Sequence, residues 1–132
     1  MTYGFAKANQ AYANVALQSC IESATPHRLI QMLYDGALQR IAQAKGFMQR
    51  GEFAAKATAI NKAIGVVGGL QGSLDRSVEH ELTANLDDLY DYLIRQLQQA
   101  NVSNVVSILD EVAHLLRELK SAWEAIPAAV GA

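Results

Sequence analysis

The sequence predicts an all-α protein, an antiparallel four-helix bundle with an additional short N-terminal helix. Between Pro26 and Pro127, the two prolines of the chain, apolar residues recur every three to four positions, which is the period of an amphipathic helix. No run of alternating β-branched residues, the usual sign of strands, is present. A chain of 132 residues buries roughly two thirds of its unfolded surface on folding, which suits a single domain over residues 1–132.

The N-terminal part of the chain predicts a short helix. In the segment "NQAYANVALQSCIES", the side chains of Tyr12 and Val15 fall near one side of such a helix. Residues 1–8 show no comparable pattern, and residues 127–132 begin with a proline that ends the preceding helical pattern. We expect both terminal segments to be flexible.

The first long helix is predicted over residues 26–50. Thr25 supplies an oxygen that caps the helix start, and Pro26 suits the first helical position. Gly51 marks the stop before the next helix begins. The apolar stripe of this helix consists of Ile30, Leu33, Ala37, Ile41, Ala44 and Met48.

Three further long helices are predicted over residues 53–74, 79–100 and 103–126. The last two each carry one apolar face, which we expect in the core. These faces consist of Leu82, Leu86, Leu89, Leu93 and Leu97, and of Val105, Ile108, Leu109, Val112, Leu115, Leu116, Leu119 and Trp123. Because short connectors join the long helices, neighbouring helices are expected to pack antiparallel.

A glycine lies in the middle of the first long helix, in the pair Asp35-Gly36 that elsewhere signals a tight turn. Helical spacing continues through this pair, so we interpret it as a helix with a notch. Gly36 falls on the shoulder of the helix, beside Leu29, Met32 and Phe47. A glycine costs about 1 kcal/mol relative to alanine in a helix interior. Either a neighbouring helix of the same fold or a bound partner offsets this cost by packing into the notch.

The second long helix is apolar over about half of its circumference, which is more than one bundle interface requires. Its two adjacent apolar rows consist of Ile60, Ile64, Val67 and Leu74, and of Ala59, Ala63, Val66 and Leu70. The opposite side carries Gly65, Gly68, Gly69 and Gly72. These glycines weaken the helix, so we expect its C-terminal end to be soft, although a solvent-facing stretch tolerated by tertiary packing explains them equally well.

Three tyrosines border the predicted core stripes. Tyr34 and Tyr90 occupy equivalent places in "LYDG" and "LYDY", and Tyr92 lies on the other shoulder of its helix. A tyrosine combines a large apolar face with a hydroxyl, which suits a boundary with water. Tyrosine, methionine and glycine on neighbouring shoulders indicate a groove, and apolar grooves on helical proteins commonly bind amphipathic helices.

Composition excludes several classes of partner and compartment. The chain has eleven Lys and Arg and thirteen Asp and Glu, which gives a net charge of −2. A protein with this charge has no basic surface potential that would attract nucleic acid. No apolar run approaches the roughly 18 residues that a membrane span needs. Cys20 is the only cysteine, and the N-terminus lacks the features of a signal peptide. We therefore expect a cytoplasmic protein without an internal disulfide or membrane insertion.

No group of residues suggests catalysis. Glu111 and His114 have the Glu-x-x-His spacing of di-iron bundles, but they point away from the core and no second pair exists in the chain. No phosphate-binding glycine loop, nucleophile triad or Cys/His metal motif is present. We expect no metal, no cofactor and no enzymatic activity.

A histidine phosphotransfer bundle is the alternative to a binding protein. Such a bundle requires one exposed histidine, and His27, His80 and His114 are the candidates. Exposure alone does not distinguish a phosphorylated histidine from an ordinary residue of a polar helix face.

Four segments together resemble the flagellar export chaperone family FliS over almost the whole chain. They agree with the family in order and spacing. These segments are "AYANVALQSCIESATPHRLIQMLYDGAL", "INKAIGVVGGLQGSLD", "NLDDLYDYLIRQLQQAN" and "EVAHLLRELKSAW". The chain departs from the family where relatives usually carry a Gly-Gly-Glu turn before the third long helix, because it has Glu79-His80-Glu81 there.

The resemblance implies a cytoplasmic helical bundle that is not an enzyme. Members of this family bind the C-terminal segment of flagellin, hold it unpolymerised and release it to the flagellar type III secretion apparatus. The expected partner is therefore flagellin in a 1:1 complex, with the export apparatus and regulators of flagellar assembly as further candidate partners. The candidate partner-binding residues are Tyr12, Ile30, Leu33, Tyr34, Gly36, Ala63, Ile64, Val67, Tyr90, Tyr92 and Leu93.

Overall fold

The computed structural model describes residues 25–75 and 81–126, and within these residues it contains four α-helices and no strand. The helices are α2 (Pro26–Gln49), α3 (Phe53–Gly72), α4 (Glu81–Ser103) and α5 (Val106–Glu124). The predicted all-α class and four long helices are confirmed. The predicted short N-terminal helix, Tyr12 and the segments 1–8 and 127–132 lie outside the described residues.

Helix α2 begins where its capping residues predict. Thr25 has extended backbone angles, and its hydroxyl accepts a hydrogen bond from the Arg28 N–H at 3.1 Å. Pro26 follows as the first helical residue, where no N–H is needed. The helix stops before Gly51, whose φ of +73° lies in the left-handed region that glycine adopts without a steric penalty. The turn 50–52 then leads directly into α3.

The boundary between α4 and α5 differs from the prediction. The sequence predicted an end near residue 100, but α4 continues to Ser103. Asn104 then takes a φ of +56°, and its N–H donates to the Ala100 carbonyl at 2.9 Å. Asparagine is one of the few residues that adopts this left-handed conformation readily. The break therefore follows the second asparagine of "NVSN" and not the first.

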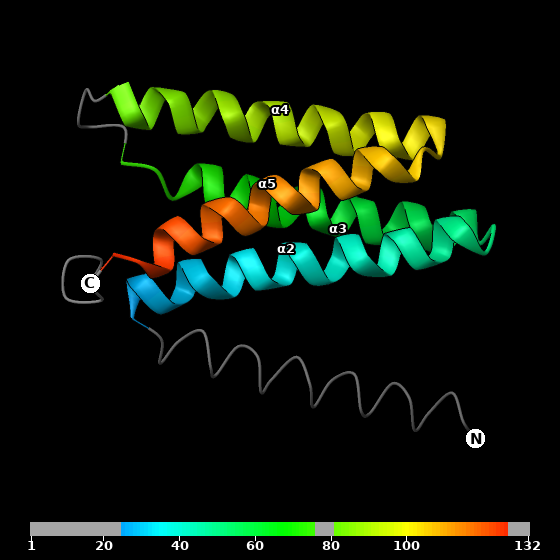
Figure 1. The fold of residues 1–132 in the computed structure, drawn as a ribbon, viewed down its shortest axis with the longest axis horizontal. Coiled ribbons are helices and arrows are strands. Elements are labelled where there is room, and N and C mark those ends of the chain that lie inside the picture. Colours follow the sequence, from blue (N-terminus) through cyan, green and yellow to red (C-terminus); the bar gives the residue numbers. More distant parts are fainter. Residues whose placement is uncertain (1–24, 76–80, 127–132) are drawn as a thin grey trace, which may run out of the picture.

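The four helices form a ring in which each contacts two neighbours, α2 with α3 and α5, and α4 with α3 and α5 (Figure 1). Successive helices run antiparallel, as predicted. The centre of the ring is filled by side chains with almost no exposed surface. The largest of them are Ile60, Leu70, Leu93, Leu97, Leu109, Leu116, Val67 and Val112.

Two residues of the predicted core faces are on the surface. Leu82 and Val105 are 59% and 41% exposed. Leu82 is the second residue of α4, and Val105 is the residue before α5. Helical periodicity predicts an apolar face along the full length of a helix. The first residues of a helix can nevertheless extend beyond the neighbouring helices that would bury them. Their assignment to the core was therefore wrong.

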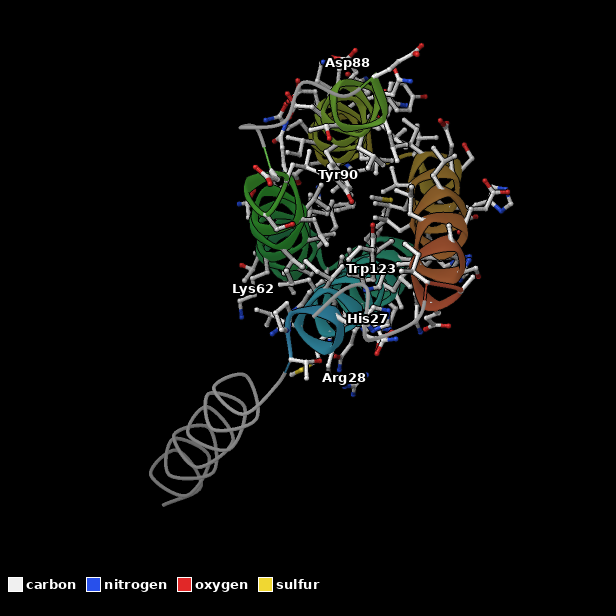
Figure 2. The ribbon with its side chains drawn as sticks, turned by 90° about the vertical axis from the view of Figure 1, so that its left-hand side faces the viewer. His27, Arg28, Lys62, Asp88, Tyr90 and Trp123 are labelled. Atoms are coloured by element: carbon white, nitrogen blue, oxygen red, sulfur yellow. The ribbon has the colours of Figure 1, made fainter. Side chains whose placement is uncertain are left out.

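Polar contacts fix the two ends of the bundle. At one end, the ring of His27 stacks on that of Trp123, with centroids 5.1 Å apart. The Trp123 Nε1–H donates to the His27 carbonyl at 2.9 Å, and His27 Nε2 lies 3.2 Å from the Trp123 carbonyl (Figure 2). At the other end, the ammonium of the buried Lys56 donates to the Asn101 carbonyl at 2.8 Å. These contacts join α2 to α5 and α3 to α4.

Candidate partner-binding groove

A groove runs along the outer face of the bundle between α2 and α3. Its first part is a hollow of about 450 Å³, to which α3 contributes one side chain, Val66. The residues that line it are Arg28, Leu29, Met32, Leu33, Asp35, Gly36, Gln39, Arg40 and Val66. The floor is therefore apolar, and charged side chains border it.

A second hollow of about 380 Å³ continues the groove toward the α2–α3 turn. Arg40 lines both hollows, so they adjoin. The residues of the second hollow are Arg40, Gln43, Phe47, Ala55, Thr58, Ala59 and Lys62. We call the two hollows together the α2–α3 groove. It offers a long, shallow surface of the kind that receives an amphipathic helix.

Gly36 lines this groove and leaves it open. A Cβ added at this position would lie 4.0 Å from Val66 Cγ1, an ordinary van der Waals distance. Packing of α2 against α3 therefore does not require a glycine here. Helix α3 borders the notch through Val66, and the notch also opens on the groove, so both explanations given by the sequence, a neighbouring helix and a bound partner, stay open.

The glycines of α3 lie at the surface, and one of them, Gly69, lies beside the groove. Nothing lies within 4 Å of a Cβ added at Gly65, Gly68 or Gly72, so this stretch faces solvent, as one of the two interpretations proposed. A Cβ at Gly69 would lie 3.9 Å from Leu33 Cδ2. A larger side chain at this position would thus cover Leu33. The absence of a side chain at Gly69 therefore keeps Leu33 and this part of the groove floor accessible.

The charged border of the groove is mainly basic. Arg28 and Arg40 line it from α2, and Lys62 lines it from α3. The carboxylate of Asp35 forms an ion pair with Lys120 of α5 at 2.6 Å. The hydrogen bond and charge of Asp35 raise the pKa of Lys120 above its ordinary value. The one carboxylate of the border is therefore already paired.

A third cavity, of about 420 Å³, opens at the end of the bundle where α2 begins, and Leu29 lines both this cavity and the first hollow. It is lined by Pro26, Leu29, Ile30, Tyr34, Ser73, Leu74, Asp75, Leu86, Tyr90 and Trp123. Tyr34 and Tyr90 are only 4% and 3% exposed, and their hydroxyls lie 2.7 Å apart. Figure 2 shows Tyr90 directed into the ring of helices. Burial raises the pKa of both tyrosines.

Tyr34 and Tyr90 do not lie at a boundary with water as the sequence suggested. Tyr34 and Tyr90 satisfy each other's hydroxyls inside the bundle, so neither needs contact with water. The hydroxyl of Tyr92 instead donates to the Glu111 carboxylate of α5, and this bond raises the pKa of Tyr92. The role at a water boundary that was inferred for Tyr34 and Tyr90 was therefore wrong. The helical position of a tyrosine within its own helix does not reveal that its hydroxyl has a partner on a different helix.

The structure brings only some of the predicted partner-binding residues together. Leu33 and Gly36 line the α2–α3 groove, whereas Ile30, Tyr34 and Tyr90 line the end cavity. Tyr92 faces α5 through Glu111.

The remaining predicted residues are buried or partly buried in the bundle, except Tyr12, which lies outside the residues that the structure describes. Ala63, Val67 and Leu93 have no exposed surface, and Ile64 is partly buried against the core. Ala63, Val67 and Leu93 contact a partner only if the helices move, whereas Ile64 keeps some exposed surface. Tyr12 lies outside the described residues, so its role stays a prediction.

The candidate list omitted most of the groove. Leu29, Met32 and Phe47 had been placed beside the notch by their helical positions, and all three do line the groove. Val66 and Lys62 were missed as site residues because their access depends on how α3 is rotated against α2. No pattern within one helix carries that information.

The histidines give no support to the phosphotransfer alternative. His27 is 6% exposed and held against Trp123, so its candidacy as an exposed histidine was wrong. The exposed His114 lies 3.2 Å from Glu118 on the same helix. His80 lies outside the described residues. Within residues 25–75 and 81–126, no group of three or more His, Cys, Asp or Glu could hold a metal ion.

Sequence comparison identifies relatives over nearly the whole chain. The family model described as flagellar protein FliS matches residues 8–130. The flagellar secretion chaperone FliSB of Pseudomonas aeruginosa is 48% identical over 120 residues, which cover 91% of this chain and 95% of the relative. The flagellar secretion chaperone FliS of Salmonella typhimurium is 42% identical over 118 residues, covering 89% and 87%.

A relative with lower sequence identity also matches most of the chain. The flagellar secretion chaperone FliS of Bacillus subtilis is 33% identical over 107 residues, covering 81% of this chain and 79% of the relative. No helix in the described part of the chain has the length and apolar character to cross a membrane. All of these relatives are named as flagellar secretion chaperones and none as an enzyme. From these matches, the chain belongs to the FliS family of flagellar secretion chaperones.

Proposed function

We propose that the chain is a cytoplasmic chaperone that binds the C-terminal segment of flagellin, prevents its premature polymerisation and keeps it competent for flagellar type III secretion. The observation that carries the proposal is the α2–α3 groove, which has an apolar floor and an open notch at Gly36. Relatives named flagellar secretion chaperones support an export client for this groove.

The groove suits a client that is unfolded before it binds. A disordered segment lacks a core of its own, so its apolar residues gain by packing on an exposed apolar floor as the segment folds. The floor of the first hollow consists largely of Leu29, Met32, Leu33 and Val66. Such a segment gains helix on binding, and its burial withholds the apolar surface that drives flagellin assembly.

The residues predicted from the sequence have different roles in this proposal, according to where they lie in the structure. Leu33 and Gly36 contact the client directly in this proposal. Ile30, Tyr34 and Tyr90 contribute through the end cavity, which lies beside the start of α2. The other predicted residues act indirectly, by packing the helices that carry the contact residues. They are Tyr92, Ile64 and the buried Ala63, Val67 and Leu93.

Calorimetric titration with the C-terminal peptide of flagellin from the same organism tests the function. We expect a 1:1 complex, and more helix in the circular dichroism of the mixture than in the sum of the separate components. Full-length flagellin monomers should also polymerise more slowly when the chaperone is present. Absence of binding to both peptide and full-length flagellin contradicts the proposal.

The substitution Gly36→Leu tests the place of binding. A leucine overfills the notch, and overpacking typically costs 1–3 kcal/mol, so affinity should fall by roughly tenfold or more. Gly36→Ala fits the available space and should raise stability by up to about 1 kcal/mol through helix propensity. The matched control is Gly68→Leu, which places the same side chain at an exposed α3 glycine outside the groove. Equal affinities for the two leucine variants would place the binding surface elsewhere.

A further inference from the structure

The net charge of −2 results from two halves of opposite sign. Helices α2 and α3, residues 26–72, carry six Lys and Arg and two Asp and Glu. Helices α4 and α5 with the residues between them carry three Lys and Arg and eight Asp and Glu. Figure 2 shows Arg28 and Lys62 on the α2–α3 side of the bundle and Asp88 on the opposite side. The groove therefore lies on the basic half of an acidic protein.

Within residues 25–75 and 81–126, no carboxylate pairs with the cations that line the groove. Arg28 donates to the neutral amide of Gln31, and Arg40 donates to that of Gln43, each at 3.3 Å. Among the residues that the structure describes, neither these two arginines nor Lys62 forms an ion pair. Their charge is available to a partner.

Other cations nearby are already engaged. Lys45 forms an ion pair with Asp110 of α5 at 2.8 Å, and Lys120 pairs with Asp35. The two ion pairs fasten α2 to α5, away from α3. The cations that serve the fold, Lys45 and Lys120, are thus different from those that line the groove, although the carboxylate of Asp35 belongs to both settings.

We propose that the α2–α3 groove selects an acidic amphipathic helix, whose carboxylates pair with Arg28, Arg40 and Lys62 while its apolar face packs on the groove floor. This inference rests on the proposed function, and it specifies the chemistry of the flagellin segment that occupies the groove. Apolar packing provides the affinity, and the charges set the register and accelerate association.

The positions of the cations define the expected client helix. Arg28 and Arg40 are separated by about 18 Å along α2 at 1.5 Å per residue. A client helix of roughly twelve residues spans the same length. Its carboxylates are expected near both ends of this stretch. At the second end, Arg40 of α2 and Lys62 of α3 approach the client from opposite sides of the groove.

Charge reversal on the groove tests the inference. The double variant Arg40→Glu/Lys62→Glu should bind the flagellin C-terminal peptide about tenfold or more weakly at low salt, since each exposed ion pair contributes a few-fold in affinity and reversal adds repulsion. The matched control is Arg95→Glu/Arg117→Glu, which makes the same change in net charge at exposed residues of α4 and α5. Thermal melting of both variants checks that they fold.

Salt dependence gives a second readout. Binding by the wild type should weaken as salt is raised from about 0.05 to 0.5 M, because the Debye length shortens over this range. The groove variant should lose most of this dependence, and the control should keep it. The peptide itself can also be changed by replacing its Asp and Glu with Asn and Gln. The wild type should bind this neutral peptide more weakly than the original peptide and with little dependence on salt.

The outcomes separate this inference from the proposed function. If the groove variant and the control bind equally, with equal salt dependence, charge selection is wrong while flagellin binding stands. If the wild type does not bind the peptide at all, the function fails first. A short DNA duplex that competes with the peptide at similar affinity would assign the basic groove to nucleic acid and overturn the inference.

Discussion

The buried hydroxyl pair of Tyr34 and Tyr90 is the main polar contact inside the core. Each ring fills space among apolar side chains, and each hydroxyl has the other as a partner at 2.7 Å. A buried hydroxyl without a partner costs roughly 1–3 kcal/mol. The pair therefore links α2 to α4 across the bundle, although the two helices are not adjacent in the ring.

The variant Tyr34→Phe tests this account. It retains the ring but leaves the Tyr90 hydroxyl without its buried partner, so the free energy of unfolding should fall by about 1–3 kcal/mol. The double variant Tyr34→Phe/Tyr90→Phe should recover much of the loss, because both polar groups are then removed. Urea denaturation of the wild type, Tyr34→Phe, Tyr90→Phe and the double variant measures the coupling. Additive losses in the double variant would contradict the pairing.

The ends of the helices are fixed by single residues with special conformations. Thr25 caps α2 through a side-chain oxygen, and Gly51 reverses the chain after it. Asn104 plays the corresponding part after α4 by adopting a positive φ of +56°. Short turns of this kind hold neighbouring helices antiparallel and so set the width of the groove between them.

Substitutions at Asn104 should report this conformational demand. The left-handed conformation costs an ordinary residue roughly 1–2 kcal/mol, so Asn104→Ala should destabilise the protein by about 1 kcal/mol. Asn104→Gly should be neutral or stabilising, because glycine adopts this conformation without a penalty. Thermal denaturation distinguishes the two variants. Equal melting temperatures for alanine and glycine would show that the turn does not constrain this residue.

The whole molecule combines an apolar core, a basic face and an acidic face. Its stability also depends on groups that must keep their protons. Burial raises the pKa of Tyr34 and Tyr90, and the neighbouring Asp35 raises that of Lys120. Each of these groups binds its proton more tightly in the folded state than in the unfolded chain.

Stability should therefore fall at alkaline pH. Above the ordinary tyrosine pKa of about 10, the unfolded chain loses protons that the folded protein retains, so unfolding releases protons and becomes easier as pH rises. Lys120 acts in the same direction, because its ion pair with Asp35 is lost as the pH rises through its raised pKa. Below about pH 9 these groups contribute no pH dependence of stability.

Denaturation midpoints measured at several pH values test this linkage. The double variant Tyr34→Phe/Tyr90→Phe should lose stability less steeply above about pH 10 than the wild type does. Absorbance of tyrosinate should show two tyrosines that ionise only when the protein unfolds. Ionisation of all five tyrosines in the folded state would contradict burial as the cause.

Local signals in the sequence determined the helices. Thr25, Pro26 and Gly51 act on their own immediate backbone, so capping chemistry predicted both ends of α2. The apolar stripe likewise predicted Leu109, Val112 and Leu116 in the core of α5, although not Ala113, because burial of one face follows from helical periodicity. Prediction failed at the end of α4, which was expected near residue 100 but lies at Ser103, before the left-handed Asn104.

The groove was decided by tertiary structure. Gly36, Leu29 and Met32 were placed together by the geometry of one helix, but Val66 and Lys62 joined them only through the rotation of α3 against α2. The pairing of Tyr34 with Tyr90 likewise depends on the distance between two helices. A sequence specifies which face of each helix is apolar, because that depends on residues three and four apart. Which faces meet, and which apolar surface stays open, depends on packing among all four helices, and no single helix contains that information.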